Sequence, residues 1–199
     1  LNENYKHPAM PEGVEEGICR GMYLLNQSPQ GKKGEPRVQL MGSGSILREV
    51  LAAATLLEED FGVGSDVWST TSFNELRRDG VRVERANRLH PTGKPEQSYV
   101  EVCLEGQEGP VIASTDYVRS VAEQIRPFVP GRFVTLGTDG FGRSDTREQL
   151  RRFFEIDRHH VVVAALKALA DEGTIPTEKA EEAIKKYKVD AEAPPPWTV

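Results

Sequence analysis

Short apolar runs alternate along this chain with longer amphipathic stretches, and this alternation constrains the fold more than any other feature. Apolar runs of about 4–8 residues are typical of buried strands, whereas longer patterns with a period near 3.6 residues are typical of helices. Strands that alternate with helices form a mainly parallel sheet with helices on both faces. We therefore predict a three-layer α/β fold. Its predicted strands are Arg37 to Met41, Val67 to Ser69, Val111 to Ala113 and Phe133 to Leu136.

The helical patterns between and after these strands carry end signals. Leu, Val and Ala line one face of the stretch from Ile46 to Phe61, and Gly62 and Gly64 then stop that helix. Asp145 and Glu148 form a pair that resembles a capping box at the start of a later helix. The other predicted helices are Ser72 to Arg78, Val83 to Leu89, Tyr117 to Pro127, Thr146 to Phe154, Arg158 to Asp171 and Pro176 to Tyr187.

Length and composition are those of one soluble domain with its own core. The net charge of -6 disfavours nucleic acid as a partner, and no apolar run approaches the roughly 20 residues of a membrane helix. Cys19 and Cys103 lie far apart and match no metal spacing, so we expect reduced thiols and a cytoplasmic protein. We divide the chain into a lead-in segment and helix (residues 1–36), an α/β domain (37–190) and an extended tail (191–199).

The lead-in segment is expected to form a helix from Pro11 to about Leu25. Gly13, Gly17 and Gly21 recur at a spacing of four within it, and a stripe without side chains suits close approach to another element. At the other end of the chain, Trp197 follows three prolines in the tail. We expect this tryptophan to dock on a surface rather than to build a core.

The motifs that could suggest a ligand site lack residues that such a site requires. The turn Gly42 to Ser45 follows a strand, but a dinucleotide fingerprint needs glycine where Leu47 stands and an acidic residue where Thr70-Thr71 stand. A small-residue turn that opens a helix is the simpler interpretation, and a weaker anion site at this helix start stays open. His159 and His160 are adjacent on a helix, so their side chains diverge and do not chelate one metal together. We predict no catalytic, cofactor-binding or metal-ligating residue.

The run from Gly137 to Asp145 joins the last predicted strand to a helix. In open α/β sheets, ligands and partners are usually met at the carboxyl ends of strands. Glycine turns and an N-cap aspartate explain most of this run, but they do not explain an aromatic ring and a guanidinium in a loop. We hypothesise that Asp139, Phe141, Arg143 and Asp145 lock the loop against a neighbouring domain or a second subunit. That Asp139 only hydrogen-bonds amides of its own loop is the equal alternative.

Four stretches of the chain resemble one known family. GTDGFGRSDTREQLRRFFEID is similar to the carboxyl-terminal part of the homodimeric, bacterial-type pyruvate dehydrogenase decarboxylating component, a thiamine-diphosphate enzyme. The same family pattern is found in LNENYKHPAMPEGVEEGI, VQLMGSGSILREVLAAATLLEEDFGVGSDVWSTTSFNELRRDG and ASTDYVRSVAEQIRPFVP. The resemblance runs from Leu1 to about Asp190, with Asn26 to Pro36 and Thr92 to Gln107 as variable filler. It implies a transketolase C-terminal-domain-like fold and a place as the last domain of a longer polypeptide.

The resemblance also implies a function for that longer polypeptide. Such an enzyme decarboxylates pyruvate, the product of glycolysis, on thiamine diphosphate with magnesium, and transfers the acetyl unit to a lipoyl group on a partner acyltransferase of the multienzyme complex. In this family two other domains hold the cofactor. Their diphosphate site begins with GDG, whereas this chain has Thr138-Asp139-Gly140. The third domain supports the homodimer and carries no catalytic group, so we expect the isolated chain to be inactive.

Other classes of function stay open. One is a regulatory α/β module that binds an anion or a nucleotide at Ser43 to Ile46 or near Arg143. Another is an independent α/β enzyme, which the lack of a convincing nucleophile, base or metal set disfavours. At the level of substrate, the alternative is the same domain from a related 2-oxo acid dehydrogenase.

Overall fold

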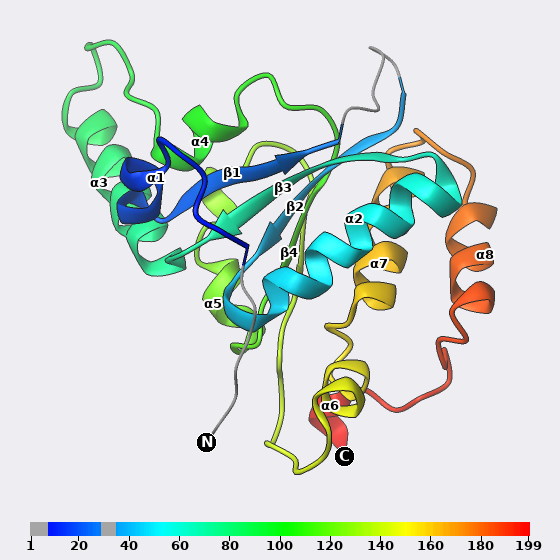
Figure 1. The fold of residues 1–199 in the computed structure, drawn as a ribbon. Coiled ribbons are helices and arrows are strands. Elements are labelled where there is room, and N and C mark those ends of the chain that lie inside the picture. The colour runs from blue at the N-terminus through cyan, green and yellow to red at the C-terminus, as the bar shows by residue number, and fades with distance from the viewer. Residues whose placement is uncertain (1–7, 29–34) are drawn as a thin grey trace.

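A five-stranded sheet forms the centre of the computed structural model, which describes residues 8–28 and 35–199 (Figure 1). Four strands run parallel, and one edge strand runs antiparallel to its neighbour. The predicted mostly parallel α/β fold with helices on both faces is confirmed. From one edge to the other, the strands are β1 (Met22–Gln27), β3 (Gly64–Thr70), β2 (Arg37–Gly42), β4 (Val111–Ser114) and β5 (Phe133–Leu136).

The parallel register brings the carboxyl ends of the strands to one level. Gly42 at the end of β2 lies opposite Ser69 of β3 and Ser114 of β4, and Ser114 lies opposite Leu136 of β5. The turns that leave β2, β4 and β5 therefore start beside one another. We call this side of the sheet the carboxyl edge.

Successive side chains of a strand point to opposite faces of the sheet, so each strand feeds two cores. Leu40 belongs to one hydrophobic cluster and Met41 to the other, and Val67 and Trp68 divide in the same way. The first cluster lies between the sheet and a layer of helices that includes α2 and α7 (Figure 1). The helices on this side are α2 (Leu47–Phe61), α6 (Arg147–Phe153), α7 (Arg158–Asp171) and α8 (Glu178–Lys186).

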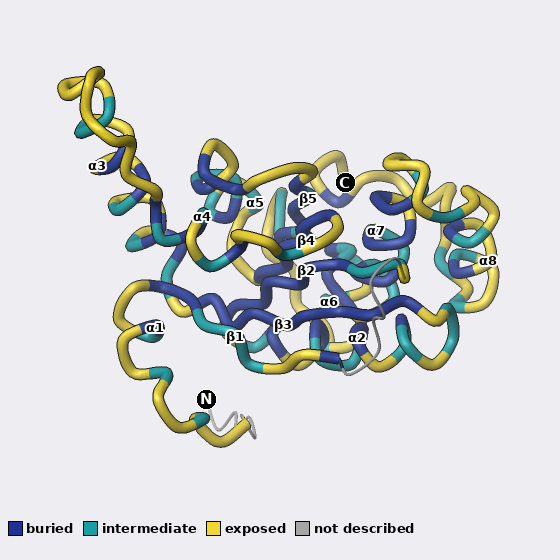
Figure 2. The backbone as a smooth tube through the Cα atoms, turned by 90° about the horizontal axis from the view of Figure 1, so that it is seen from above, coloured by how far each residue is buried: buried dark blue, intermediate teal, exposed yellow. Residues whose placement is uncertain are grey.

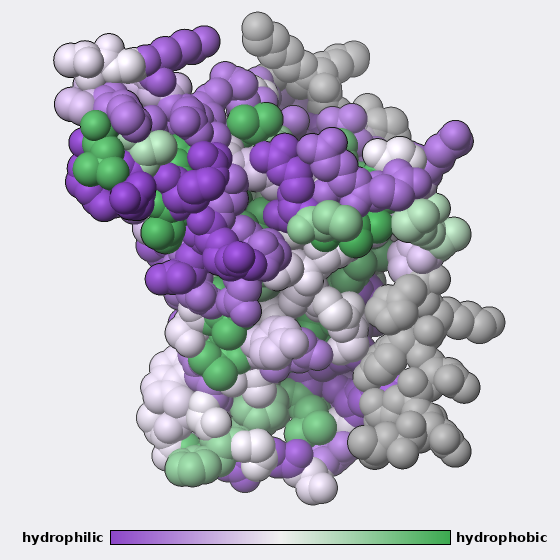
Figure 3. All heavy atoms as spheres, turned by 90° about the vertical axis from the view of Figure 1, so that its left-hand side faces the viewer, coloured by the Kyte–Doolittle hydropathy of each residue, from purple (hydrophilic) through white to green (hydrophobic). Residues whose placement is uncertain are grey.

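The second cluster lies on the opposite face of the sheet. Phe73 and Leu76 from one helix pack there with Met41, Trp68 and Ile125. In Figure 2 the strands are buried along most of their length, whereas the far end of α3 is exposed. Figure 3 shows that the surface over α3 is largely hydrophilic. The helices of this layer are α3 (Phe73–Leu89), α4 (Tyr99–Leu104) and α5 (Arg119–Glu123).

The predicted lead-in helix from Pro11 to Leu25 is wrong in its second half. The helix α1 spans only Glu15–Arg20, because Gly21 adopts a left-handed conformation with φ of 110° and ends it. The chain then forms β1, which pairs with β3. Gly17 of α1 allows the close approach of Tyr23 in β1, because a Cβ atom on Gly17 would lie 2.8 Å from Cβ of Tyr23. Residues 1–7 and 29–34, which include parts of the lead-in segment and of the variable stretch from Asn26 to Pro36, lie outside the described residues.

Two predicted helices, Ser72 to Arg78 and Val83 to Leu89, form the single helix α3. Gly80 lies between the two predicted pieces, and the helix continues through it. The missing side chain of Gly80 leaves room for a side chain of another element. A Cβ atom on Gly80 would lie 2.4 Å from the ring of Phe128. The prediction from Tyr117 to Pro127 was too long, since only α5 and a separate 3-10 turn at Arg126–Phe128 form there.

The polar stretch from Thr92 to Gln107 contains the unpredicted helix α4. Ser98 and Glu101 form a capping box at its start, with each side chain accepting a hydrogen bond from the other residue's backbone amide. At α6 the N-cap is Thr146, whose hydroxyl accepts from the amide of Gln149. The capping pair predicted at Asp145 and Glu148 was therefore wrong by one residue. Division of the chain at residues 36 and 190 stays a prediction.

None of the helices in residues 8–28 and 35–199 combines the length and the apolar character that a bilayer crossing requires.

Alanine usually stabilises a helix interior relative to glycine, by about 0.5–1 kcal/mol. We expect the opposite at Gly80, where the added methyl group has to displace the Phe128 ring, at a cost of about 1–3 kcal/mol. Urea unfolding of the Gly80→Ala variant measures this. Arg85→Ala on the exposed side of α3 is the control and should change the free energy of unfolding by less than about 0.5 kcal/mol. A more stable Gly80→Ala variant would contradict the packing.

Candidate functional site

The turns after β2 and β4 are joined at the carboxyl edge by side-chain hydrogen bonds. Ser43 Oγ donates to Thr115 Oγ1 at 2.8 Å, and Ser45 Oγ donates to Asp116 Oδ2 at 3.2 Å. The amide of Ser43 also donates to the carbonyl of Ser114 at 3.3 Å. These hydroxyls therefore tie two turns together. Since Asp116 places a carboxylate beside the start of the α2 helix, the same position disfavours an anion.

The loop after β5 is fixed to the turn after β4 by Asp139. Its Oδ1 accepts a hydrogen bond from the amide of Arg119 at 2.9 Å, and its Oδ2 lies 3.3 Å from Nε of the same arginine. The amide of Thr138 donates to the carbonyl of Tyr117 at 2.8 Å. Asp139 thus binds a neighbouring loop of the same domain.

The other three residues of the predicted interface loop have separate surroundings. Phe141 is 85% exposed. The guanidinium carbon of Arg143 lies 4.7 Å from the centroid of the Phe153 ring, which is a cation–π contact with α6. Asp145 Oδ1 accepts from the amide of Thr146 at 2.6 Å, next to the start of α6. The structure therefore anchors both ends of the loop and leaves the Phe141 ring in solvent.

Glu49 was not among the predicted site residues, yet it places a buried carboxylate close to the carboxyl edge. Glu49 of α2 is 4% exposed and accepts hydrogen bonds from Arg151 Nη1 at 2.8 Å and Arg158 Nε at 2.9 Å. Burial by itself raises the pKa of Glu49, but the hydrogen bonds and charge of Arg158, together with the charge of Arg151, outweigh burial and hold this pKa below its usual value. Glu49 therefore joins α2, α6 and α7.

Asp157 organises the start of α7 in a similar way. Its Oδ1 accepts from the amide of His160 at 2.9 Å and lies 2.7 Å from Nδ1 of the same residue. Nδ1 of His159 lies 3.7 Å from Oδ2 of Asp157, and the His159 ring stacks on Tyr187 with ring centroids 4.6 Å apart. Burial raises the pKa of Asp157, but the hydrogen bonds from His160 outweigh it and the pKa is lowered. Both rings thus lie near Asp157, but only the His160 ring is within hydrogen-bond distance of it, and the His159 ring stacks on Tyr187.

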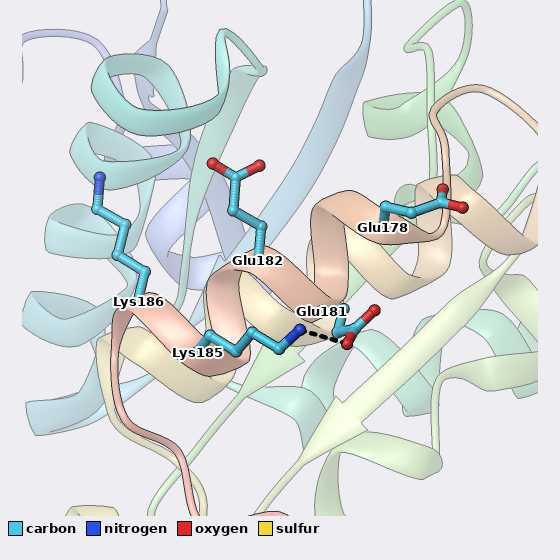
Figure 4. Close-up of a pocket in the computed structure, with 5 residues that line it drawn as sticks. All are labelled: Glu178, Glu181, Glu182, Lys185 and Lys186. Carbon is cyan, nitrogen blue, oxygen red and sulfur yellow. Dashed lines mark hydrogen bonds and ion pairs between the residues drawn. The ribbon is translucent and has the colours of Figure 1, made fainter.

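Two hollows adjoin this part of the surface. One of about 210 Å³ lies between the start of α2 and α6, and one of about 510 Å³ lies over Glu49 and the arginines around it. A third hollow, of about 620 Å³, is lined by Glu178, Glu181, Glu182, Lys185 and Lys186. All five of these side chains come from α8, and Lys185 pairs with Glu181 (Figure 4). The third hollow is therefore the solvated flank of one helix.

The described residues offer little for catalysis or metal binding. Within residues 8–28 and 35–199, no group of three or more His, Cys, Asp or Glu side chains is arranged to hold a metal ion. Both cysteines are free thiols, and burial raises the pKa of Cys103, which makes that thiol a poor nucleophile. The hydroxyls of Ser43 and Ser45 bond to Thr115 and Asp116, and neither histidine is their partner. These hydroxyls connect the turns after β2 and β4.

Comparison with known proteins assigns the fold to a family. The profile of the transketolase-like TK C-terminal domain matches residues 21–157, from the start of β1 to the N-cap of α7. The chain belongs to this family. Transketolases from Campylobacter jejuni and Pichia stipitis have the same fold, each with a TM-score of 0.52. Their identities to the chain are 18% and 21%, and the matches cover 81% and 79% of it but only 20% and 19% of the transketolases.

Members of the family with higher sequence identity are bacterial pyruvate dehydrogenase E1 components. The protein from Cupriavidus necator is 61% identical over the whole chain, and that from Pseudomonas aeruginosa is 63% identical over 96% of it. The Escherichia coli K12 protein is 53% identical over 96%. The chain spans about a fifth of the length of these relatives, 22%, 22% and 21% respectively, and corresponds to their carboxyl-terminal part. The predicted resemblance is confirmed.

We expect Glu49→Gln to lower the free energy of unfolding at pH 7 by about 2 kcal/mol, because the amide lacks the negative charge that pairs with both arginines and places an NH2 donor where one of them donates. The folded-state pKa of Glu49 lies below its unfolded value of 4.5, so its contribution is complete above pH 4.5 and is lost as pH falls toward the folded-state pKa. The difference between variant and wild type should therefore shrink as acid is added.

Urea unfolding between pH 7 and pH 3 measures this difference. Glu59→Gln, on an exposed position of the same helix, is the matched control and should follow the wild type at every pH. A Glu49→Gln deficit that stays constant down to pH 3 would contradict the assigned role.

Proposed function

We propose that this chain is the carboxyl-terminal domain of a pyruvate dehydrogenase E1 component and that its role there is structural. The observation that carries the proposal is the 61% identity over the full chain to the carboxyl-terminal part of one such component. The described residues support it with a core of their own and a carboxyl edge whose polar groups bind one another. We place the domain in a cytoplasmic homodimer, in contact with the other domains of its own chain and with a second subunit.

The longer protein, on this proposal, carries out oxidative decarboxylation of pyruvate with thiamine diphosphate and magnesium. The acetyl unit passes to a lipoyl group of the partner acyltransferase in the multienzyme complex. The residues of this chain do not fit the cofactor, because the carboxylate of Asp139 in Thr138-Asp139-Gly140 is committed to Arg119. Cofactor and catalytic groups therefore belong to the other domains, and the isolated chain is inactive.

The structure weighs against the regulatory alternative at the turn from Ser43 to Ile46. An anion there would meet the Asp116 carboxylate, which already accepts from Ser45. At the level of substrate, the relatives from Cupriavidus necator, Pseudomonas aeruginosa and Escherichia coli are all named for pyruvate, which favours pyruvate over another 2-oxo acid.

Titration of the isolated chain with magnesium and thiamine diphosphate tests the absence of a cofactor site. We expect no heat of binding in calorimetry and no turnover of pyruvate, because the chain offers no ligand set for the diphosphate. The full-length protein, titrated under the same conditions, is the positive control. Saturable micromolar binding to the isolated chain would overturn the structural role.

The proposed contact through the loop is tested in the full-length protein. We expect Phe141→Ala to weaken the dimer at least about tenfold, since an exposed aromatic anchor that becomes buried at an interface contributes about 2 kcal/mol or more, and tenfold corresponds to about 1.4 kcal/mol. Arg143→Ala should weaken it as well, because its guanidinium steadies the loop against Phe153. Sedimentation equilibrium measures both constants, with Ser144→Ala as an exposed control in the same loop. Unchanged dimer constants in both variants would contradict the contact.

A further inference from the structure

The sheet has a topological switch point between β2 and β4. These two strands are parallel neighbours, but the chain leaves β2 into α2 on one face of the sheet and leaves β4 into α5 on the other face. The two turns therefore diverge at the carboxyl edge. In open α/β sheets, ligands bind in the crevice that such a divergence opens outside the ends of the strands.

A small hollow lies at this place, between the turns after β2 and β4, the loop after β5 and α6. It has a volume of about 210 Å³, and the apolar part of its lining consists of Ile46, Leu150, Phe154 and Ile156. Ile46, Phe154 and Ile156 are buried members of the first core cluster, so the core itself holds this lining in place. At about 30 Å³ for each water molecule, the hollow suits a ligand of about seven to nine non-hydrogen atoms.

Opposite charges line the same hollow. Asp116 is exposed, and its Oδ2 accepts a hydrogen bond from Ser45 Oγ at 3.2 Å. Arg151 reaches the hollow from α6, and among the described residues it donates only through Nη1, to the Glu49 carboxylate that it shares with Arg158. Because a guanidinium has five N–H donors, Arg151 can bind a second carboxylate as well. Asp116 repels a purely anionic ligand and Arg151 a purely cationic one, so the hollow fits a zwitterion.

A buried hydroxyl at the end of β4 lacks a partner. Ser114 lies two residues before Asp116, its side chain is fully buried, and its Oγ forms no hydrogen bond within residues 8–28 and 35–199. Side chains alternate along a strand, so Ser114 points to the same face of the sheet as Ile112, which is the face that carries the hollow. Buried polar atoms nearly always have a partner. This hydroxyl therefore points to a polar ligand on that face, or to a water bound with it.

We infer that the hollow at the switch point binds a small aliphatic amino acid. Its ammonium group pairs with Asp116 and its carboxylate with Arg151, while its side chain lies on the apolar lining. Leucine has the matching size and shape. This site goes beyond the proposed structural role and does not rest on it. Thiamine diphosphate is much larger and anionic, so the hollow does not accept that cofactor.

Calorimetric titration of the full-length protein and of the isolated chain with L-leucine tests the inference. We expect saturable binding to both, with a dissociation constant of about 1 mM or tighter. Three further ligands each lack one group: isocaproate has no ammonium, isoamylamine has no carboxylate, and glycine has no aliphatic side chain. Each should bind at least about tenfold more weakly than leucine, because it leaves Asp116, Arg151 or the apolar lining without its partner.

A variant of Asp116 locates the binding. Asp116→Asn keeps an oxygen that can accept from Ser45 but removes the charge, so we expect it to weaken leucine binding at least about tenfold. Glu105→Gln is the matched control, because Glu105 is exposed at the end of α4, on the opposite face of the sheet. It should bind leucine as the wild type does.

The outcomes separate this inference from the proposed function. It is overturned if leucine binds to neither protein, or if Asp116→Asn leaves binding unchanged. Binding to only one of the two proteins also overturns it, because the site then lies in another domain or is filled by one. Isocaproate or isoamylamine that binds as tightly as leucine excludes the zwitterion. Thermal unfolding identifies a variant that does not fold, and the ligand series, which needs no variant, then decides. None of these outcomes alters the structural role, which saturable binding of thiamine diphosphate would overturn.

Discussion

Parallel pairing of β2, β4 and β5 is the constraint on which the surface features depend. Parallel strands in register end at one level, and the chain must leave all of them on the same side of the sheet. Three turns that are far apart in sequence thereby become neighbours, and short polar side chains satisfy their backbone groups. The hydrogen bond from Ser43 to Thr115 and that from the Arg119 amide to Asp139 both follow from this arrangement. In a sheet with another strand order, these hydrogen-bonding groups would not be neighbours.

The buried ion cluster around Glu49 connects the helices α2, α6 and α7 beside this edge of the sheet. Burial of a carboxylate is costly unless opposite charges and donors surround it, and here Arg151 of α6 and Arg158 of α7 supply both. Because α6 follows the loop from Gly137 to Asp145 directly, the cluster fixes the far end of that loop, while Asp139 fixes its near end. A loop anchored at both ends can expose Phe141 without losing its shape. The exposed ring is therefore a consequence of contacts that lie beneath it.

Hydrophobic runs sufficed to predict the four parallel strands, because strands buried on both faces must be apolar. Edge strand β1 was read as helix, since its apolar residues fit either period and Gly21 alone marks the change. The helix α3 was predicted as two separate pieces, and the packing role of Gly80 between them depends on Phe128, which lies on another element. The capping box of Ser98 and Glu101 was a local signal for α4 that could have been used. Glu49 gave no such signal, since its burial depends on Arg151 and Arg158, which lie 102 and 109 residues away.

The geometry of the carboxyl edge depends on how closely neighbouring segments approach one another. Here that geometry depends on backbone contacts as much as on side chains, as the packing of the tail against Gly140 illustrates, where a Cβ atom would lie 2.9 Å from the Pro196 carbonyl oxygen. A close approach of two backbones admits no Cβ atom, so it is specific without any polar group. It also brings together two segments that are nearly sixty residues apart in the sequence. The conformational entropy of both segments is lost once, during folding, and the close packing of their backbones offsets part of that cost.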